Sequence, residues 1–376
     1  MSYPVFQPYL GVEELAACSA ALESKYLGLG SFVRDFEVAL ADFLSLGESH
    51  HILTFSTGHA AMHLGLLALG LKPGDEVITP SFNNIADFQA IEAVGATPVM
   101  CDIDENSLCI DPERAAQLIT NKTKVIVAMD YASRIADHSK LASLASSYNV
   151  TLFHDAAHSF GSFYQNKPIG HQSEMTMMSF DPIKNITCID GGALIFRNDI
   201  LVEPLRQMRM IGMGQRIQKS YKNKRDWGYD VKLLGYRYHL SNLHASVGLS
   251  QLNKFAFIRS QRKLLYSAYY SKLDSLDVCI TQGPLHDDVV PFIFCLRVPA
   301  SKRNTFKAFL LDHGIETGIH WKPGHHFSRY RDCRRGPLPI TDKIADEIVS
   351  LPFYPDMNVE DVDFISDKII SFFSSQ

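Results

Sequence analysis

Long apolar runs, paired cysteines and an excess of charge of one sign are all missing from this sequence. No apolar run approaches the roughly 20 residues that cross a bilayer, and the start at 1–5 lacks a charged segment followed by a long apolar one. The seven cysteines are scattered, without Cys-x-x-Cys pairs, which argues against a disulfide framework or a zinc site. The 36 basic and 41 acidic residues nearly balance, which argues against non-specific nucleic-acid binding. We therefore expect a cytoplasmic protein with neither a membrane nor a nucleic-acid partner.

Strands and helices alternate along the first part of the chain. Apolar runs at 51–55, 76–80, 123–129 and 150–155 are typical of buried strands, and segments with apolar residues at helical spacing lie between them. Alternation of this kind predicts an α/β fold with a mainly parallel sheet covered by helices.

The last part of the chain has a different pattern. A long helical pattern at 243–273 is followed by predicted strands at 291–298 and 318–321, which flank a helix at 302–314. This order predicts a smaller C-terminal α+β domain.

The length of the chain supports two domains. A chain of 376 residues is long for a single hydrophobic core. We place the large domain at 1–245, and the small domain with its connecting helix at 246–376.

A lysine stands between two strand-like runs. Lys184 follows the apolar run 175–180, and a Gly-Gly turn then opens a second run at 193–196. Partial desolvation lowers the pKa of an amine at the edge of a sheet, which frees its lone pair to attack a carbonyl. Upstream, the strand at 150–155 ends in an acid, Asp155. Acid and lysine in this order fit a pyridine cofactor, with the carboxylate on the ring nitrogen and the lysine on the aldehyde carbon.

The blocks around these two residues resemble those of the DegT/DnrJ/EryC1/StrS family, sugar aminotransferases that use pyridoxal 5'-phosphate (PLP) and have fold type I. The chain reads His-Asp-Ala-Ala-His at 154–158, where the family has Glu-Asp-Ala-Ala-Gln/His. It reads Ser-Phe-Asp-Pro-Ile-Lys-Asn at 179–185, where the family has Ser-Phe-x-x-x-Lys-Asn. Asp-Gly-Gly follows at 190–192, where the family has an acid and two glycines. The similarity runs nearly end to end, and implies the fold of type I PLP-dependent transferases.

The resemblance implies a role for each residue of these blocks. Lys184 would hold the cofactor and, once released, move protons, so that it is catalytic. Asp155 would pair with the ring nitrogen and keep it protonated. His158 would contact the ring hydroxyl, and Ser179 the phosphate.

A small-residue turn into a helix is the expected phosphate site. Thr57 and Gly58 precede a helical run after the strand at 51–55, and free amides at the start of a helix suit an anion. The resemblance places Thr57, Gly58 and His59 on the PLP phosphate. His59 stands where the family usually has threonine.

The face of the cofactor ring is where the chain departs most from its family. The family places an aromatic ring at the position that is Asn84 here. Either Phe82 supplies the ring instead, or the amide of Asn84 covers this face.

Two further blocks imply a partner subunit and a substrate pocket. Arg237 and His239 lie in a run that, in the family, reaches the phosphate of the partner subunit, which implies a homodimer with shared active sites; a solvated loop charge is the alternative for each. His320, Trp321 and His325 resemble the family segment that borders the substrate. Two histidines five residues apart, without acidic or cysteine companions in sequence, do not predict a metal.

Together these features predict an aminotransferase. It would move an amino group from an amino acid, glutamate by family analogy, to a keto-sugar, most simply a nucleotide-linked one, for surface polysaccharide or amino-sugar biosynthesis. A family branch that removes a sugar hydroxyl has histidine in place of Lys184. The alternatives are another fold type I PLP enzyme, or a sugar-nucleotide-binding homologue with weak or no PLP, because Asn84 and His59 depart from the family pattern.

Overall fold

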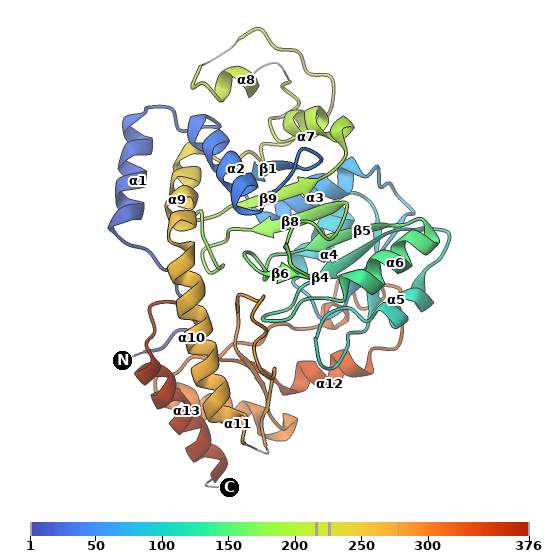
Figure 1. The fold of residues 1–376 in the computed structure, drawn as a ribbon. Coiled ribbons are helices and arrows are strands. Elements are labelled where there is room, and N and C mark those ends of the chain that lie inside the picture. The colour runs from blue at the N-terminus through green and yellow to red at the C-terminus, as the bar shows by residue number, and fades with distance from the viewer. Residues whose placement is uncertain (1, 215–216, 225–226, 277, 375–376) are drawn as a thin grey trace.

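A seven-stranded sheet is the centre of the computed structural model, which describes residues 2–214, 217–224, 227–276 and 278–374 (Figure 1). Its strands are β1 (His51–Phe55), β2 (Glu76–Pro80), β3 (Thr97–Cys101), β4 (Thr123–Met129), β5 (Thr151–Asp155), β8 (Met175–Ser179) and β9 (Gly192–Phe196). Their order is β1-β9-β8-β5-β4-β2-β3. The strands from β8 to β3 are parallel, and β9 is antiparallel to both of its neighbours. The predicted α/β fold with a mainly parallel sheet is confirmed.

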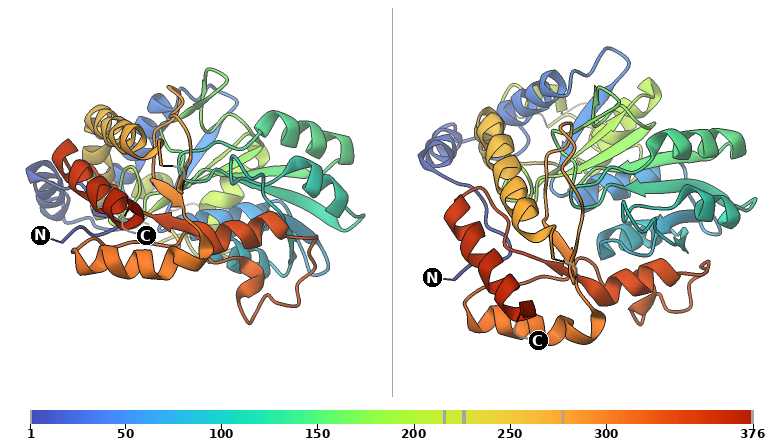
Figure 2. Two further views of the ribbon diagram at one scale, coloured as in Figure 1. Left: turned by 90° about the horizontal axis from the view of Figure 1, so that it is seen from below. Right: turned by 60° about the horizontal axis from the view of Figure 1, so that its bottom comes forward.

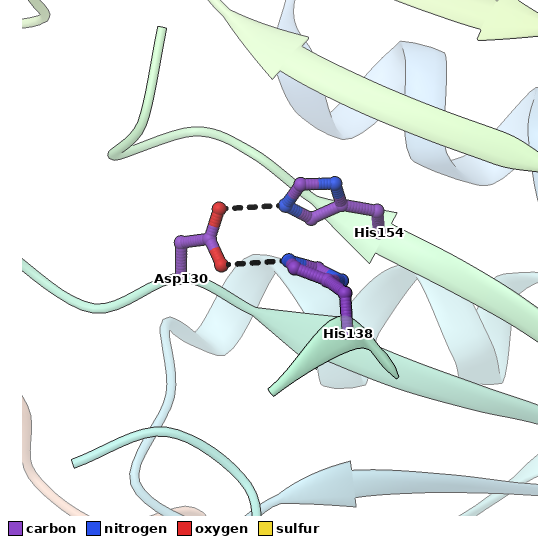
Figure 3. Close-up of side chains that lie close together, drawn as sticks. All are labelled: Asp130, His138 and His154. Atoms are coloured by element: carbon purple, nitrogen blue, oxygen red, sulfur yellow. Dashed lines mark hydrogen bonds and ion pairs between the residues drawn. The ribbon is translucent and has the colours of Figure 1, made fainter. Parts of the chain in front are cut away.

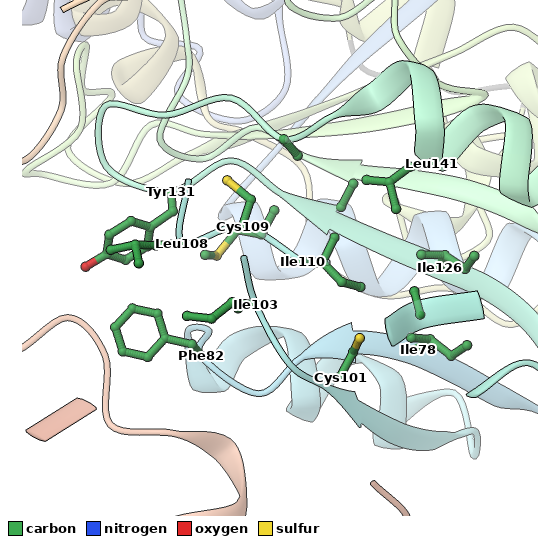
Figure 4. Close-up of a cluster of buried hydrophobic side chains, with 14 of the residues drawn as sticks. Ile78, Phe82, Cys101, Ile103, Leu108, Cys109, Ile110, Ile126, Tyr131 and Leu141 are labelled. Atoms are coloured by element: carbon green, nitrogen blue, oxygen red, sulfur yellow. The ribbon is translucent and has the colours of Figure 1, made fainter. Parts of the chain in front are cut away.

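Both faces of this sheet are buried, because alternate residues of each strand enter different cores. In β4, Val125 and Val127 pack into one core, while Ile126 and Ala128 pack into the other. Figure 4 shows part of the second core, which includes Leu141 of a covering helix. One face is covered by α3 (Gly58–Ala68), α4 (Ile85–Ala93) and α7 (Val202–Met208); the other by α2 (Ser31–Phe43), α5 (Pro112–Leu118), α6 (His138–Tyr148) and α9 (Asn242–Asn253).

A small antiparallel sheet organises the C-terminal part. Its strands, in the order β10-β11-β12, are β10 (Ile280–Thr281), β11 (Cys295–Arg297) and β12 (Ile348–Ser350). Around it lie α10 (Phe255–Leu273), α11 (Ala300–Asp312), α12 (Pro339–Glu347) and α13 (Val359–Ser374). This arrangement agrees with the α+β character expected for this part.

The N-terminal segment packs on the C-terminal part rather than on the large sheet. The N–H of Tyr3 donates to the Gly314 carbonyl at 2.8 Å, and that of Phe353 to the Val5 carbonyl at 3.0 Å. The start of the chain accordingly lies beside α13 in the views of Figure 2. The division at residue 245 stays a prediction.

Three predicted elements differ from the structure. The helix expected at 243–273 is two helices, because Lys254 leaves helical geometry (φ −91°, ψ 0°) while its ammonium pairs with Glu14 at 2.6 Å. Of the strand expected at 291–298, only β11 (Cys295–Arg297) forms. The apolar residues before it, Phe292 and Phe294, pack into two separate cores and not into a strand.

The strand expected at 318–321 is also absent from the described residues. Gly318 forms a single bridge to Ser350, with both hydrogen bonds at 2.9 Å.

Among the described residues, no helix is long and apolar enough to cross a membrane.

Candidate active site

A cavity of about 550 Å³ opens at the carboxyl ends of β5 and β8, where parallel α/β sheets usually bind ligands. The sequence-predicted residues that line it are Thr57, Gly58, His59, Asn84, Asp155, His158, Ser179, Lys184, His320 and Trp321. Four others, Phe82, Arg237, His239 and His325, lie outside its lining.

Lys184 enters the cavity from the loop between β8 and β9. Its ammonium lies 4.6 Å from the centre of the Phe292 ring, and this apolar neighbour keeps water from one side. Burial lowers the pKa of the amine to about 8, although the negative charge of Asp155 opposes the shift. About a tenth of the amine is therefore uncharged at pH 7, far more than for an ordinary lysine.

Asp155 is the last residue of β5 and is 2 % exposed. Its Oδ1 accepts the N–H of Ala157 at 2.9 Å. Burial raises the pKa of the carboxyl to about 6, while the Ala157 N–H and the Lys184 charge favour the ionised form. Asp155 is thus mainly an anion at neutral pH, as a partner for a cationic ring nitrogen must be.

Asp87 is a residue of this cavity that the sequence analysis missed. It lies in the first turn of α4, is 1 % exposed, and accepts a hydrogen bond from Nδ2 of Asn83 at 2.8 Å. Its carboxyl also meets that of Asp155, and burial followed by this second negative charge raises the pKa of Asp87 well above its usual value. An acid in the first turn after a capping asparagine is ordinary in a helix, so the sequence carries no signal that it faces a ligand.

His158 has a fixed proton position. Its Nδ1 accepts the N–H of Ala132 at 3.1 Å, so the proton of the neutral ring is on Nε2. Burial, followed by the charge of Lys184, lowers the pKa of His158 well below its usual value. The ring therefore offers one neutral N–H donor to a ligand in the cavity.

The start of α3 provides the anion site. Thr57 caps the helix by accepting the N–H of Ala60 at 2.9 Å. A Cβ on Gly58 would lie 3.0 Å from the Cβ of Ser179, so glycine lets the helix start approach β8 closely. The free amides of the first turn and the Ser179 hydroxyl then line one end of the cavity.

His59 does not replace the expected threonine in a simple way. Its Nδ1 lies 3.0 Å from the carbonyl oxygen of Ala86 and donates to it. The imidazole is thus tied to the first turn of α4, and only its Nε2 remains for a ligand.

An aromatic wall closes the opposite side of the cavity. Phe6, from the N-terminal segment, stacks on Phe292 at 5.7 Å and meets the His320 ring edge at 5.2 Å. Burial lowers the pKa of His320 to about 4, so this ring is neutral. The Nε1 of Trp321 is buried without a hydrogen-bond partner among the described residues.

The position of Phe82 corrects one of the two alternatives for the ring face. Phe82 is fully buried in the core, 5.2 Å from the Tyr131 ring, and is outside the cavity lining. Asn84 does line the cavity, and its Oδ1 caps α4 by accepting the N–H of Ala86 at 2.9 Å. Of the two residues, only Asn84 lines the cavity.

The remaining predicted residues lie at other places. Arg237 is exposed and forms a backbone bridge with Met210, and the backbone of His239 bridges Phe55 of β1. His325 is hydrogen-bonded to the Ser81 hydroxyl at 2.8 Å.

Two groups of histidine and aspartate could offer ligand atoms to a metal within the described residues. The first group is His325, His326 and Asp342. Asp342 of α12, which is distant in sequence, pairs with both histidines, so His325 does have an acidic neighbour in the structure. In each group every Nε2 is already hydrogen-bonded to the carboxylate, which accounts for the arrangement.

The second group, Asp130, His138 and His154, is fully buried, and His154 directly precedes Asp155 in β5. Asp130 accepts from Nε2 of His154 at 2.7 Å and from Nε2 of His138 at 3.1 Å (Figure 3). Burial alone would raise the pKa of Asp130, but the two imidazoles outweigh it and lower that pKa far below its usual value. Burial lowers the pKa of His154, even against the Asp130 charge.

The fold and this cavity define a type I PLP-dependent enzyme. The model of the DegT/DnrJ/EryC1/StrS aminotransferase family matches residues 8–370, and the chain belongs to that family. It is a PLP-dependent sugar aminotransferase, which confirms the class of enzyme and the cofactor predicted from the sequence.

Solved structures agree with this assignment. The aminotransferase TlmJ from Streptoalloteichus hindustanus matches with a TM-score of 0.92 and 28% identity, covering 99% of each chain. PseC from Helicobacter pylori, an aminotransferase involved in the biosynthesis of pseudoaminic acid, matches with a TM-score of 0.92 and 25% identity over 100% of each chain. Spr1654 from Streptococcus pneumoniae in its PLP-form, at 24% identity and a TM-score of 0.88, shares the fold over 98% of this chain and 97% of its own.

The residues of the cavity fit PLP. A helix start with a close glycine suits the phosphate, a buried anion at Asp155 suits a protonated ring nitrogen, and a neutral donor at His158 suits the ring oxygen. The amine of Lys184 lies in the same cavity as these groups.

Proposed function

We propose that this enzyme takes an amino group from glutamate and transfers it to a nucleotide-linked keto-sugar in the cytoplasm. The observation that carries the proposal is that Lys184 and Asp155 share one cavity with the start of α3. Donor, nucleotide and pathway rest on family analogy, as the class of enzyme does not define them.

In this proposal Lys184 is the residue that holds the cofactor and moves the proton. PLP, when bound, supplies an electron sink that allows a proton to leave the α-carbon of an amino acid. An amine whose pKa is near 8 can accept and return that proton close to neutral pH. Phe292 covers one side of the amine and limits exchange with water.

The other cavity residues would orient the cofactor. Asp155 would hold the ring nitrogen in its protonated form, and Nε2–H of His158 would donate to the ring oxygen. The phosphate would lie against Thr57, Gly58 and Ser179, where free amides and hydroxyls converge. The amide of Asn84 would face the ring in place of an aromatic side chain.

The aromatic wall is the proposed sugar site. The Trp321 ring offers a flat apolar surface, and its partnerless Nε1–H can donate to a sugar hydroxyl or a phosphate. His320 is neutral and adds a second polar group. His325, which lies outside the cavity lining, would act only on a part of the substrate that extends beyond it. The predicted pathway, surface polysaccharide or amino-sugar biosynthesis, is compatible with what PseC is named for.

We propose a homodimer in which Arg237 or His239 reaches the phosphate of the partner subunit. The backbone of Arg237 pairs with Met210, and its side chain is exposed and can extend toward a second subunit. The outer side of α1 (Val12–Glu23) carries exposed apolar residues, among them Val12 at 74% and Leu15 at 71%, and such residues are common at subunit interfaces.

The experiment is a two-stage assay with the purified protein. PLP-loaded protein is first mixed with glutamate, and conversion of the bound cofactor is followed by visible absorption. A panel of nucleotide-linked keto-sugars is then added, and the aminated product is sought by mass spectrometry. Conversion of the cofactor by glutamate, followed by amination of a sugar, supports the proposal. Conversion only by another amino acid contradicts the proposed donor. Absence of an aminated product with every keto-sugar of the panel contradicts the proposed acceptor.

A further inference from the structure

Two carboxyl groups line the cavity and interact with each other, and the cofactor needs only one of them. Asp87 and Asp155 come from α4 and β5, are 1 % and 2 % exposed, and both line the cavity. Two adjacent carboxylates in a desolvated site repel each other strongly, so such a pair keeps one proton.

The hydrogen bonds of the two residues decide which carboxyl keeps it. Asp155 already accepts the Ala157 N–H at 2.9 Å and faces the charge of Lys184, and both favour its ionised form. Asp87 has one neutral donor, Nδ2 of Asn83, at 2.8 Å. Asn83 is itself fixed, because its Oδ1 accepts the N–H of Asn84 at 2.6 Å. Asn83 donates to Oδ2 of Asp87, so a proton on the Asp87 carboxyl can point toward Asp155.

We propose that Asp87 is a neutral carboxylic acid that donates its proton in a hydrogen bond to the Asp155 carboxylate, and so positions and tunes the anion on the cofactor ring nitrogen. This inference rests on the proposed role of Asp155. Asp87 is a positioning residue, since it acts through Asp155. The hydrogen bond disperses part of the negative charge and limits rotation of the carboxylate.

The groups that face the pair come from each neighbouring element. Lys184 lies on the loop after β8, Asp130 follows β4, and His59 of α3 is tied to Ala86 beside Asp87. Lys184 favours ionisation of both carboxyls, and Asp130 opposes ionisation of Asp155. Burial is nevertheless the largest influence on each carboxyl and favours the protonated form.

The test uses two variants of full-length protein. Asp87→Asn is neutral and can donate its amide N–H to Asp155 while its oxygen accepts from Asn83, so it imitates the proposed acid. Asp87→Ala removes the donor. We expect Asp87→Asn to bind PLP nearly as well as wild type, and Asp87→Ala to bind it roughly tenfold more weakly or worse, because a hydrogen bond to a charge is lost.

An infrared spectrum gives a readout that does not depend on activity. Wild type at neutral pH, with or without PLP, should show the band of a protonated carboxyl that Asp87→Asn lacks. At high pH, where Asp87 loses its proton, the visible spectrum of the loaded wild type should change while that of Asp87→Asn should not. No difference in the infrared band, or Asp87→Asn as weak as Asp87→Ala, would overturn the proposal. If Asp87→Ala does not fold, the wild-type and Asp87→Asn spectra decide alone.

The infrared result is independent of the transferase reaction. A protein that shows the band but does not respond to glutamate would contradict the proposed amino donor and leave the carboxyl pair established. A protein that responds to glutamate but lacks the band would retain its proposed function without this device.

Discussion

Two groups of ionisable side chains lie side by side in this enzyme, and their buried acids behave in opposite ways. The cavity group is Asp87, Asp155 and Lys184, and the enclosed group is Asp130, His138 and His154. Asp155, at 2 % exposure, has a pKa raised to about 6, whereas Asp130, at 0 %, has a pKa far below its usual value. Burial is the same, so the partners make the difference. Asp130 receives N–H bonds from two imidazoles, whereas Asp155 receives one backbone N–H, that of Ala157, so burial dominates the pKa of Asp155.

Strand geometry explains how the two groups remain separate. His154 and Asp155 are neighbours at the end of β5, and successive side chains of a strand point to opposite faces. One face delivers His154 to Asp130 in the interior (Figure 3), and the other delivers Asp155 to the cavity. The group in the cavity should therefore control activity, and the enclosed group stability.

The largest effect is expected from Lys184→Ala, which removes the amine of the cavity group. Amino transfer should fall by about 10⁴-fold, because the proton carrier is lost. The rate of cofactor conversion by glutamate measures this. Lys140→Ala, at an exposed helix position, is the matched control. A Lys184→Ala enzyme with activity close to that of wild type would show that the cavity group is not the reaction centre.

Asp155→Asn should lower the rate of the same conversion by roughly 10²- to 10³-fold, as loss of one preorganised charge does. The amide can still accept the N–H of Ala157, so the free energy of unfolding should change by only about 1 kcal/mol. Denaturant unfolding and glutamate conversion are measured on one preparation. A large loss of stability with full activity per folded molecule would reverse the assignment of the two groups.

Asp130→Asn is the matched variant in the enclosed group. It removes the charge that two histidines share and should destabilise the protein by about 3 kcal/mol, as breaking a buried pair does. Activity per folded molecule should be largely retained, since Asp130 is outside the cavity lining. Unfolding in urea checks the first expectation, and glutamate conversion at low temperature the second.

Local patterns account for the parts of this comparison that could be predicted from the sequence. The strands were predictable because a parallel sheet buried on both faces needs apolar runs, and Lys184 and Asp155 follow such runs directly. The amides at the start of α3 were predictable because a small-residue turn precedes a helical run.

Pairings between distant segments were not predictable. Asp87 reads as an ordinary first-turn acid, and only the fold, which brings the start of α4 and the end of β5 to one cavity, places it near Asp155. Asp342 reaches His325 across 17 residues and a change of element. The sequence left Phe82 as a candidate to stack on the cofactor ring, because its neighbours in sequence do not reveal that its side chain faces the core.

The pH dependence of stability gives a smaller effect. His154 is buried with a pKa lowered from 6.5, so the unfolded chain takes up a proton first as the pH falls. Stability should therefore decrease below about pH 6.5, by up to about 1.4 kcal/mol per pH unit. His154→Gln keeps an N–H for Asp130 but does not titrate, so the loss of stability that begins near pH 6.5 should be smaller in this variant.

Below about pH 4 the unfolded chain protonates Asp130, whereas the folded protein, in which this pKa is far lower, does not. The resulting loss of stability should persist in that variant. His286→Gln, at an exposed histidine, should leave the whole curve unchanged. If His154→Gln follows the wild-type curve, the enclosed group does not set the stability at acidic pH.

The smallest effect expected is a shift in the reactivity of Lys184 that only the cavity group should cause. The rate at which protein without cofactor takes up PLP should rise with pH and level off above about 8, because only the uncharged amine attacks. Asp155→Asn removes an anion that raises this pKa, so the midpoint should move to lower pH, by about one unit or less. Asp130→Asn should leave the midpoint in place, as Asp130 is not among the charges that act on Lys184. An equal shift in both variants would mean that both acids influence the pKa of Lys184 to the same extent. The two faces of β5 would then separate the groups in space but not in their effect on the amine.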